Sequence, residues 1–410
     1  MRSYKKRIFQ QKNIFLLCIA IRNIFEAIVA PGGLIFTSFF IFLGLADHEI
    51  GYILGFIALT NVFQLFSPVI YEKFKSPKKM VLILRILRFC SFYFVLLLPF
   101  VENLRFVILL FIIFTSMSFG SLMGGIFLAW NDRIIPMDRK GRYYSTRNLI
   151  ANGIAILIPL CIGKILDHYT HTTKLFIIIF IVSIFFAIGE LLIITKLDDY
   201  DIITNNKISL KKILFLPLRD KKYRDFIIFS LLWMFAFSFA RPFFNLYAIR
   251  YIKLSYKFIA FVASTTAIIK LLLAKVWGAG VDRFGWKKIL KYTGLFYAST
   301  HFLWFFIHVN SHIIYFLFVL INGIFMIGFN ISKFNVNLAL TDHENRLSYI
   351  AVNSAITALF SFISTNISTS IIQLINPQWK LFSFDIFQVL FGFAGLLYLV
   401  AIVYIIKKDL

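Results

Sequence analysis

Charged residues are scarce in this sequence. Asp, Glu, Lys and Arg together make up 15% of the 410 residues, whereas a soluble domain carries about 25%. The charges that do occur cluster between long apolar runs, and the mean hydropathy is +0.83. This scarcity excludes a large soluble protein and predicts an integral membrane protein, because long uncharged runs are typical of chains that span a bilayer.

Cysteine is almost absent. Cys18, Cys90 and Cys161 each fall within an apolar run, and we expect them to be small buried side chains. The sequence has no metal-ligand spacing and no phosphate-binding P-loop, so it predicts neither a metal site nor direct use of ATP. We expect no cofactor.

Acidic residues are also few, since 19 Asp and Glu stand against 43 Lys and Arg, giving a formal net charge of +24. In a soluble protein this excess would suggest a nucleic-acid partner. Here the basic residues stand at the ends of apolar runs, where positive charge orients a membrane chain. We therefore expect membrane lipid as a partner, and no nucleic acid.

Twelve apolar segments are long enough to cross the hydrocarbon core, which takes about 20 helical residues. Only helices and closed barrels satisfy their backbone groups in lipid, and a barrel would show short alternating runs instead. The predicted fold is therefore all-α. The segments are 14–44, 48–70, 79–99, 104–130, 147–167, 172–195, 225–250, 256–281, 288–307, 311–338, 347–375 and 383–406.

The basic residues follow a regular alternation along the chain. The residues before the first segment resemble a signal peptide, but Arg22 and Glu26 interrupt the apolar run, so we expect an uncleaved first helix. Most of the 43 basic residues lie in every second connection, counted from the N-terminus. This predicts a multi-pass inner (plasma) membrane protein with both termini in the cytoplasm. The long polar stretch 196–224 then separates two six-helix halves, 1–195 and 225–410.

The two halves share residues at constant offsets, as in transporters built from repeats. Pro31 and Pro242 occupy similar places in the first segment of each half. Other matching pairs are Ser67 and Gly278, Gly124 and Gly328, Asn131 and Asn335, Asp138 and Asp342, and Arg142 and Arg346.

A charged, glycine-containing motif lies between segments 256–281 and 288–307. It reads Gly278-Ala-Gly-Val-Asp282-Arg283-Phe-Gly285-Trp-Lys-Lys and resembles the G-x-x-x-D-R-x-G-R-K signature of the major facilitator superfamily. Its counterpart in the first half, 67–75, keeps only the basic end and a displaced acid. Gly278 and Gly285 would allow close helix approach and a tight turn. Asp282 and Arg283 can pair with the neighbouring bundle as a cytoplasmic gate.

A second charged stretch follows segment 104–130 and resembles the R-G-R-type sequence common at this place in the same superfamily. The resemblance implies two six-helix bundles that rock around a cavity lined by the first, fourth, seventh and tenth segments. Segment 147–167 lacks the Gly-Pro signature of drug antiporters, so drug/proton antiport is not inferred. The gating residues expected from this stretch and from its echo near 342 are Asn131, Asp132, Asp138, Arg142, Asp342 and Arg346.

Charged side chains inside membrane helices are costly and often mark function. Arg22 and Glu26 share one helical face. They either form a stabilising pair or serve transport, with Glu26 exchanging a proton and Arg22 holding an anionic substrate. Near Pro242, which can break its helix, Arg241 and Asn245 also share a face with Ser238. The remaining candidates for the substrate cavity are Asn61, Gln64, Lys270 and Asn330.

Other polar residues suggest structural roles. We expect Arg85 and Arg88 to reach the cytoplasmic headgroups, and Glu190 to lie near a solvated helix end. His301 is expected to pack or to lie at the interface. A stripe of hydroxyl residues at helical spacing favours helix packing over substrate contact. It consists of Ser354, Thr357, Ser361, Ser364 and Ser368.

Together these features predict a secondary carrier of a small solute, and not an enzyme. The deep residues are mostly basic, which favours an anionic substrate, and Glu26 is the expected site of proton coupling. Two alternatives remain. One is a non-transporting sensor or assembly factor on the same fold. The other is a membrane-embedded lipid-modifying enzyme, for which Asp342-His343-Glu344 is the nearest catalytic grouping.

Overall fold

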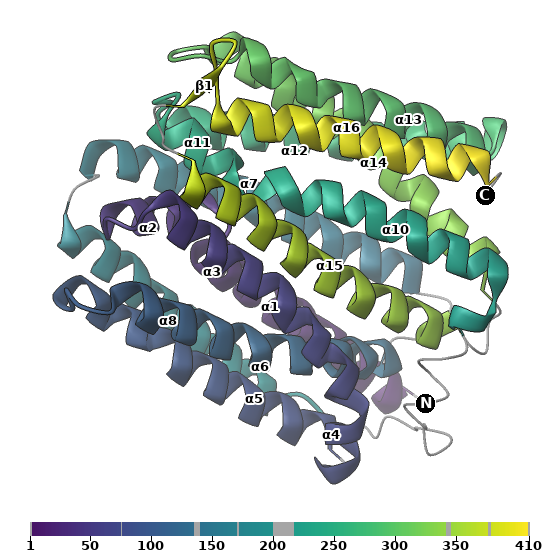
Figure 1. Cartoon of the computed structure of the whole chain (residues 1–410). Coiled ribbons are helices and arrows are strands. Elements are labelled where there is room, and N and C mark those ends of the chain that lie inside the picture. The colour runs from purple at the N-terminus through teal and green to yellow at the C-terminus, as the bar shows by residue number, and fades with distance from the viewer. Residues whose placement is uncertain are drawn as a thin grey trace. The chain divides into compact units, whose positions relative to one another are not determined.

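The computed structural model describes residues 2–74, 76–134, 140–169, 172–199, 217–341, 346–375 and 379–408, and these are almost entirely helical (Figure 1). Within these ranges, eleven helical segments are long and apolar enough to cross a membrane. The twelfth predicted segment, 288–307, is formed by α13 (Trp286–Thr300) and the 3-10 helix η5 (His301–Phe306). The all-α prediction is confirmed.

The chain divides into two compact units that do not follow sequence order throughout. The first consists of Met1–Leu45 and Thr60–Asn206, and the second of Ala46–Leu59 and Lys207–Leu410. A short piece from the N-terminal half of the sequence therefore packs with the C-terminal half.

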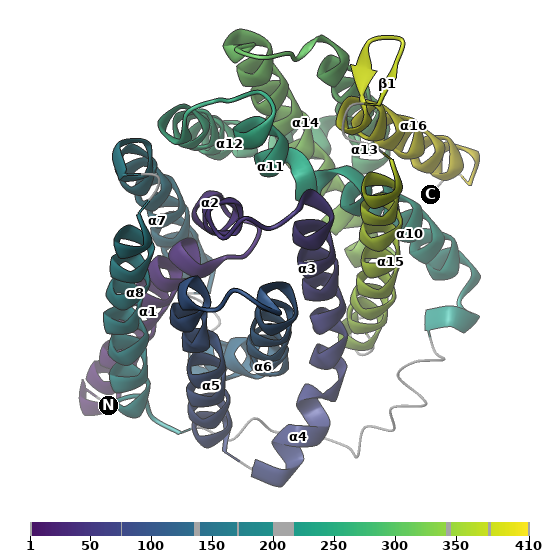
Figure 2. The ribbon, with the colours of Figure 1, turned by 60° about the vertical axis from the view of Figure 1, so that its left-hand side comes forward.

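The first unit is built from nine described helices. Here α1 packs on α7 and α8, while α5 packs on α6, and Figure 2 shows α5 beside α6. Between α1 and α2 the chain breaks at Pro31, which lacks the N–H that a continuous helix needs. The helices are α1 (Arg2–Val29), α2 (Leu34–Phe42), η1 (Asn61–Phe66), α4 (Ser67–Phe74), α5 (Pro77–Tyr93), η2 (Phe94–Phe100), α6 (Arg105–Ile134), α7 (Lys140–Tyr169) and α8 (Thr173–Thr195).

The second unit packs around an aromatic core. The rings of Trp233 and Phe329 stack with centroids 3.6 Å apart, and Tyr297 and Tyr398 close the cluster. Besides α13 and η5, its elements are α3 (Asp47–Thr60), α10 (Lys221–Ala240), η4 (Arg241–Phe243), α11 (Phe244–Arg250), α12 (Tyr256–Phe284), α14 (His312–Ala339), α15 (Arg346–Leu374), the hairpin strands β1 (Lys380–Leu381) and β2 (Phe384–Asp385), and α16 (Ile386–Lys407).

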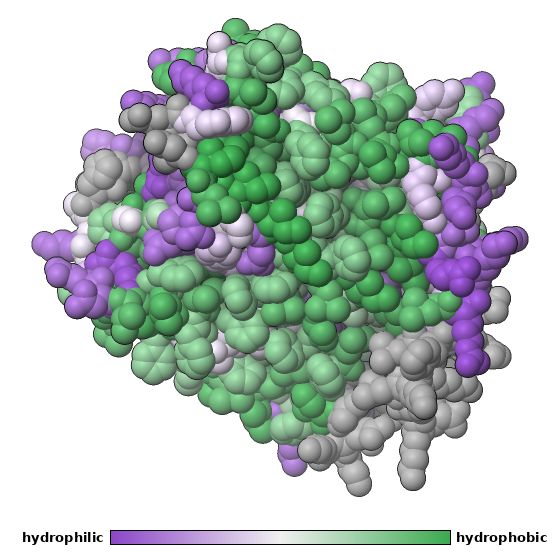
Figure 3. Space-filling model, viewed as in Figure 1, coloured by the Kyte–Doolittle hydropathy of each residue, from purple (hydrophilic) through white to green (hydrophobic). Residues whose placement is uncertain are grey.

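Large apolar side chains cover the outside of the helices. Phe111, Phe185 and Ile313 are each at least 70% exposed, an arrangement that suits lipid and not water. On the face that Figure 3 shows, hydrophobic residues cover the middle of the helices and hydrophilic residues gather near their ends. This surface fits a multi-pass membrane protein.

Polar contacts fix α3 to the rest of the second unit. The Asp47 carboxylate pairs with the Arg250 guanidinium and accepts a hydrogen bond from the Tyr251 hydroxyl. Further along α3, the Tyr52 hydroxyl donates to Gln373 Oε1 of α15 at 2.8 Å. Burial and the Asp47 carboxylate raise the pKa of Tyr251 above its ordinary range, so this hydroxyl keeps its proton and remains a donor.

Candidate functional site

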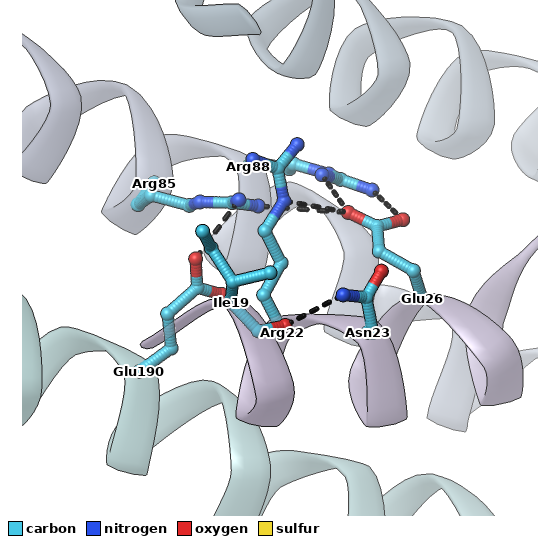
Figure 4. A network of polar contacts seen from close by, with 7 residues as sticks. All are labelled: Ile19, Arg22, Asn23, Glu26, Arg85, Arg88 and Glu190. Atoms are coloured by element: carbon cyan, nitrogen blue, oxygen red, sulfur yellow. Dashed lines mark hydrogen bonds and ion pairs between the residues drawn. The ribbon is translucent and has the colours of Figure 1, made fainter. Parts of the chain in front are cut away.

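Five charged side chains meet inside the first unit, as Figure 4 shows. Arg22 and Glu26 lie one turn apart on α1, Arg85 and Arg88 lie one turn apart on α5, and Glu190 comes from α8. Helical spacing of three or four residues directs each pair to one face. The packing of α1 and α5 against α8 then brings the three faces together.

The Glu26 carboxylate is the centre of this network. Arg88 donates to it through both terminal nitrogens, with Nη1–Oε1 at 2.6 Å and Nη2–Oε2 at 2.8 Å. Arg85 Nη1 and Arg22 Nε approach the same Oε1 at 3.7 and 3.9 Å. The bidentate contact with Arg88 is the strongest of the three. Arg22, at 3.9 Å, is the weakest partner of Glu26.

Arg85 and Glu190 form a second, deeper ion pair. Arg85 Nη2 lies 2.9 Å from Glu190 Oε1, and both side chains are fully buried. None of the described groups completes a hydrogen bond to either carboxylate oxygen of Glu190. The pair is therefore held by charge attraction, with part of its desolvation cost left unmatched.

Two sequence-based interpretations are wrong here. Arg85 and Arg88 were expected at the cytoplasmic headgroups and Glu190 at a solvated helix end, yet Arg85 and Glu190 are 0% exposed and Arg88 is 4% exposed. The reason is that each of these side chains faces an opposite charge on a neighbouring helix, and this pairing offsets part of the cost of burial. The arginine side chains therefore do not need to extend to the headgroups. The prediction for His301 is confirmed, since its ring is buried against Tyr297 and Tyr398.

The network carries more positive than negative charge, with three guanidinium groups against two carboxylates. Aromatic faces stabilise the excess positive charge: Arg22 lies over the Phe127 ring at 5.2 Å and Arg88 over the Phe25 ring at 5.6 Å. Arg22 and Glu26 are 25% and 30% exposed. Arg22 and Glu26 therefore form the accessible edge of a cluster that is otherwise buried.

The polar candidates on η1 lie in the same unit. Asn61 and Gln64 are exposed, and Gln64 Nε2 lies 3.7 Å from the point where a Cβ on Gly125 would stand. Nearby, the Thr60 and Ser121 hydroxyls are 3.5 Å apart. Polar groups of η1 thus face the glycine-containing part of α6.

Two of the candidates in the second unit, Arg241 and Asn245, lie at a helix break. The helix stops at Ala240, turns through η4 at Arg241 and Pro242, and continues as α11. Pro242 cannot donate to the Ser238 carbonyl, and Thr365 Oγ1 of α15 donates to it instead at 2.9 Å. The expected break at Pro242 is confirmed.

Within the hydroxyl stripe on α15, Ser364 Oγ donates to the Phe235 carbonyl of α10 at 2.6 Å. Thr357 donates back to the Asn353 carbonyl of its own helix at 2.7 Å. These described contacts fit the packing role expected for the stripe.

The remaining candidates of the second unit differ in exposure. Arg241 and Asn330 are exposed, while Asn245 and Lys270 are half-buried. The Arg241 guanidinium lies near the rings of Phe237 and Phe244, at 5.8 and 6.0 Å from their centroids.

The signature motif forms a tight junction between α12 and α13. Gly285, with φ at +82°, ends α12 and immediately precedes α13, so the turn expected there is present. Asp282 and Arg283 are exposed. No heavy atom lies within 4 Å of a Cβ built on Gly278, so the close helix approach expected at this glycine is not found among the described residues.

Only one of the other gating candidates has a described side chain. Asn131 is buried, and its Oδ1 accepts a hydrogen bond from the Tyr143 hydroxyl at 2.7 Å. The side chains of Asp132, Asp138, Arg142, Asp342 and Arg346 lie outside the described residues.

The cysteines differ from expectation. Cys18 is buried, but Cys90 and Cys161 are exposed, because their helix faces point outward from the unit rather than into its core. Across the described ranges, no group of three His, Cys, Asp or Glu side chains gathers to hold a metal ion.

Comparison with known proteins decides the family. The profile of the Major Facilitator Superfamily matches residues 15–365, most of the chain. The chain belongs to the Major Facilitator Superfamily. A search among curated protein sequences finds no match.

Solved structures of several transporters share the fold over nearly the whole chain. A mutant of the nucleoside transporter NupG matches with TM-score 0.72 at 13% identity, covering 98% of this chain and 99% of that one. A bacterial homologue of the iron transporter ferroportin, in an inward-facing state, matches with TM-score 0.69 at 15% identity and 98% coverage of both chains. A POT family transporter in complex with 5-aminolevulinic acid matches with TM-score 0.69 at 13% identity, covering 98% and 96%. At such identities the likeness concerns the fold.

Proposed function

We propose that this superfamily member is a secondary active carrier that moves a small anionic solute across the membrane by alternating access. The observation that carries the proposal is the charge excess in the first unit, where three guanidinium groups meet two carboxylates and the edge of the cluster is accessible. An uncompensated positive charge within membrane helices is costly, and an anionic solute would offset that cost.

The proposal includes an architecture and an orientation. Residues 1–195 and 225–410 would act as the two six-helix bundles, joined by the cytoplasmic connection 196–224. Both termini would face the cytoplasm of the inner membrane, because the basic connections alternate in that sense. The exposed Asp282 and Arg283, on the same side, would serve the cytoplasmic gate together with Asn131.

Coupling to protons would follow from competition for Arg22. The Arg22 Nε atom lies 3.9 Å from the Glu26 carboxylate, which is a weak contact. The anionic group of the solute can therefore bind the Arg22 guanidinium while the contact between Arg88 and Glu26 stays intact. Extra negative charge beside Glu26 favours the protonated carboxyl. One solute anion and one proton would then cross together, and the net charge of the cluster would change little.

The test is uptake by the purified protein in proteoliposomes, screened over small metabolites with and without an imposed pH gradient. We expect accumulation of an anionic solute that is driven by the gradient. Glu26→Gln should abolish gradient-driven accumulation but retain exchange of internal for external solute, because the carboxyl can no longer release its proton.

Glu102→Gln supplies the matched control, since Glu102 is exposed in the connection after η2, and it should leave uptake unchanged. If Glu26→Gln still accumulates the solute under a pH gradient, Glu26 is not the coupling residue. If the protein binds solutes but moves none of them, the sensor alternative replaces the carrier.

A further inference from the structure

Arg85 lies between two carboxylates that come from different helices (Figure 4). Its Nη2 atom is 2.9 Å from Oε1 of Glu190 on α8, and its Nη1 atom is 3.7 Å from Oε1 of Glu26 on α1. The shorter distance belongs to Glu190, so the guanidinium is drawn mainly towards α8. The two acids therefore share one cation unequally.

Glu190 is a costly residue at its position. Its side chain is 0% exposed, and none of the described groups completes a hydrogen bond to either of its carboxylate oxygens. A pair of apolar side chains could join α5 to α8 at lower cost than a buried ion pair. This cost indicates that Glu190 has a role besides packing.

The charge balance around Glu26 depends on Glu190. Besides Arg85, the cations beside Glu26 are Arg88, in a bidentate contact, and Arg22 at 3.9 Å. The described parts of α2, α6 and α7, which also contact α1, add no ion pair to either carboxylate. Three cations favour the ionised form of Glu26, and among the charged groups of this network only Glu190 opposes them.

Two further titratable side chains lie on the same packed helices. Cys18 is buried one turn before Arg22 on α1, and the Tyr93 hydroxyl of α5 is 3.1 Å from the Ser183 hydroxyl of α8. Thiols and phenols are neutral over the pH range in which carboxyl groups titrate. Neither side chain therefore alters the balance of charge around Glu26.

We propose that Glu190 is a positioning residue for the coupling carboxylate: by holding Arg85 on α8, it keeps Glu26 able to accept a proton. The proposal rests on the proposed carrier function, in which Glu26 exchanges the proton, and it adds the residue that sets the pH of that exchange. Without the charge of Glu190, Arg85 is free to turn to Glu26. The three cations then hold the Glu26 carboxylate in its ionised form.

The first test is the pH dependence of uptake in proteoliposomes. Glu190→Gln removes the charge at nearly constant shape, and the pH of half-maximal uptake should fall by about 1–3 units, because a free cation beside a carboxylate favours its ionised form by that amount. Glu190→Asp keeps the charge on a shorter side chain. Its midpoint should lie between those of the wild type and Glu190→Gln.

A role in packing alone predicts a different result. Loss of packing would reduce the maximal rate of uptake and leave the pH midpoint in place. Arg85→Leu/Glu190→Leu removes both charges, so its midpoint should not lie below that of the wild type. This double variant and Glu190→Asp test the proposal even if Glu190→Gln is too unstable to purify.

The matched control is Glu102→Gln, which removes an exposed carboxylate of the same unit and should leave the pH midpoint unchanged. An unchanged midpoint in Glu190→Gln, or a lowered midpoint in the double variant, would overturn the proposal.

A crystal structure of Glu190→Gln supplies a test that needs no transport. We expect Arg85 Nη1 to move from 3.7 Å to hydrogen-bonding distance of Glu26, about 3 Å. If Arg85 moves in this way but the wild type transports no solute, the positioning role stands and the carrier function fails. If the wild type transports a solute but Arg85 and the pH midpoint both stay in place, the carrier function stands and the positioning role is refuted.

Discussion

Arg85 and Glu190 show how strongly one residue in this protein depends on another. Each would be prohibitively costly in lipid alone, and together they lie fully buried at 2.9 Å. Removing one partner from a buried pair leaves a bare charge, whereas removing both leaves an apolar contact.

We therefore expect Glu190→Gln to lower the free energy of unfolding by about 3–5 kcal/mol, measured by titration with a denaturing detergent. The double variant Arg85→Leu/Glu190→Leu should recover most of the loss, because it removes both charges together. Equal stability of Glu190→Gln and the wild type would show that the pair contributes no net attraction.

At this scale the sequence predicted some partners and missed others. Arg22 and Glu26 could be paired in advance because one helix carries both at helical spacing. Arg88, the tightest partner of Glu26, lies on another helix, and its direction depends on how α1 and α5 pack. The residue pattern of a single segment does not show which face packs against a neighbouring helix. The environment of each charged side chain was therefore judged from its distance to the end of its segment. This led to wrong placements of Arg85, Arg88 and Glu190.

At the scale of helices, the sequence predicted the breaks at prolines but not what surrounds the glycines. Pro31 and Pro242 were paired in the sequence, and both stand at helix breaks, because a missing N–H acts locally. Gly124 and Gly328 were also paired but differ in surroundings. A Cβ on Gly328 would lie 2.8 Å from both Trp277 and Thr293, whereas one on Gly124 meets nothing within 4 Å.

This difference gives a matched pair of variants. Gly328→Ala should destabilise the protein by about 1–3 kcal/mol, because it overpacks the junction of α12, α13 and α14. Gly124→Ala should stay within about 1 kcal/mol of the wild type. Thermal denaturation in detergent measures both, and an equal effect of the two substitutions would contradict the packing difference.

For the molecule as a whole, the sequence predicted the helical class, the number of membrane segments and the family. It did not predict that residues 46–59 would pack with the C-terminal half. That grouping depends on contacts such as Tyr52 with Gln373 and Gly51 with Thr369. Residues so far apart in the chain leave no periodic signal.

The α3–α15 contact allows a test of alternating access. In a chain whose three cysteines are first replaced by alanine, Tyr52→Cys and Gln373→Cys place two thiols where a hydrogen bond of 2.8 Å now stands. In the proposed cycle α3 moves with residues 1–195 and α15 moves with residues 225–410, although residues 46–59 pack with the second unit in this structure. A short bifunctional reagent that joins α3 to α15 should therefore stop uptake in proteoliposomes. Each single-cysteine variant should keep its uptake after the same treatment, and full activity of the cross-linked double variant would contradict the prediction.

The buried pair of α5 and α8 also bears on how the protein is made. During synthesis, the segment bearing Arg85 leaves the ribosome well before the one bearing Glu190. The earlier carboxylate, Glu26, is held mainly by Arg88, and an arginine without its nearest counter-ion partitions poorly into lipid. The early segment should therefore wait beside the insertion machinery until its counter-ion arrives, so that the whole N-terminal unit is released into the bilayer as one assembly and not helix by helix.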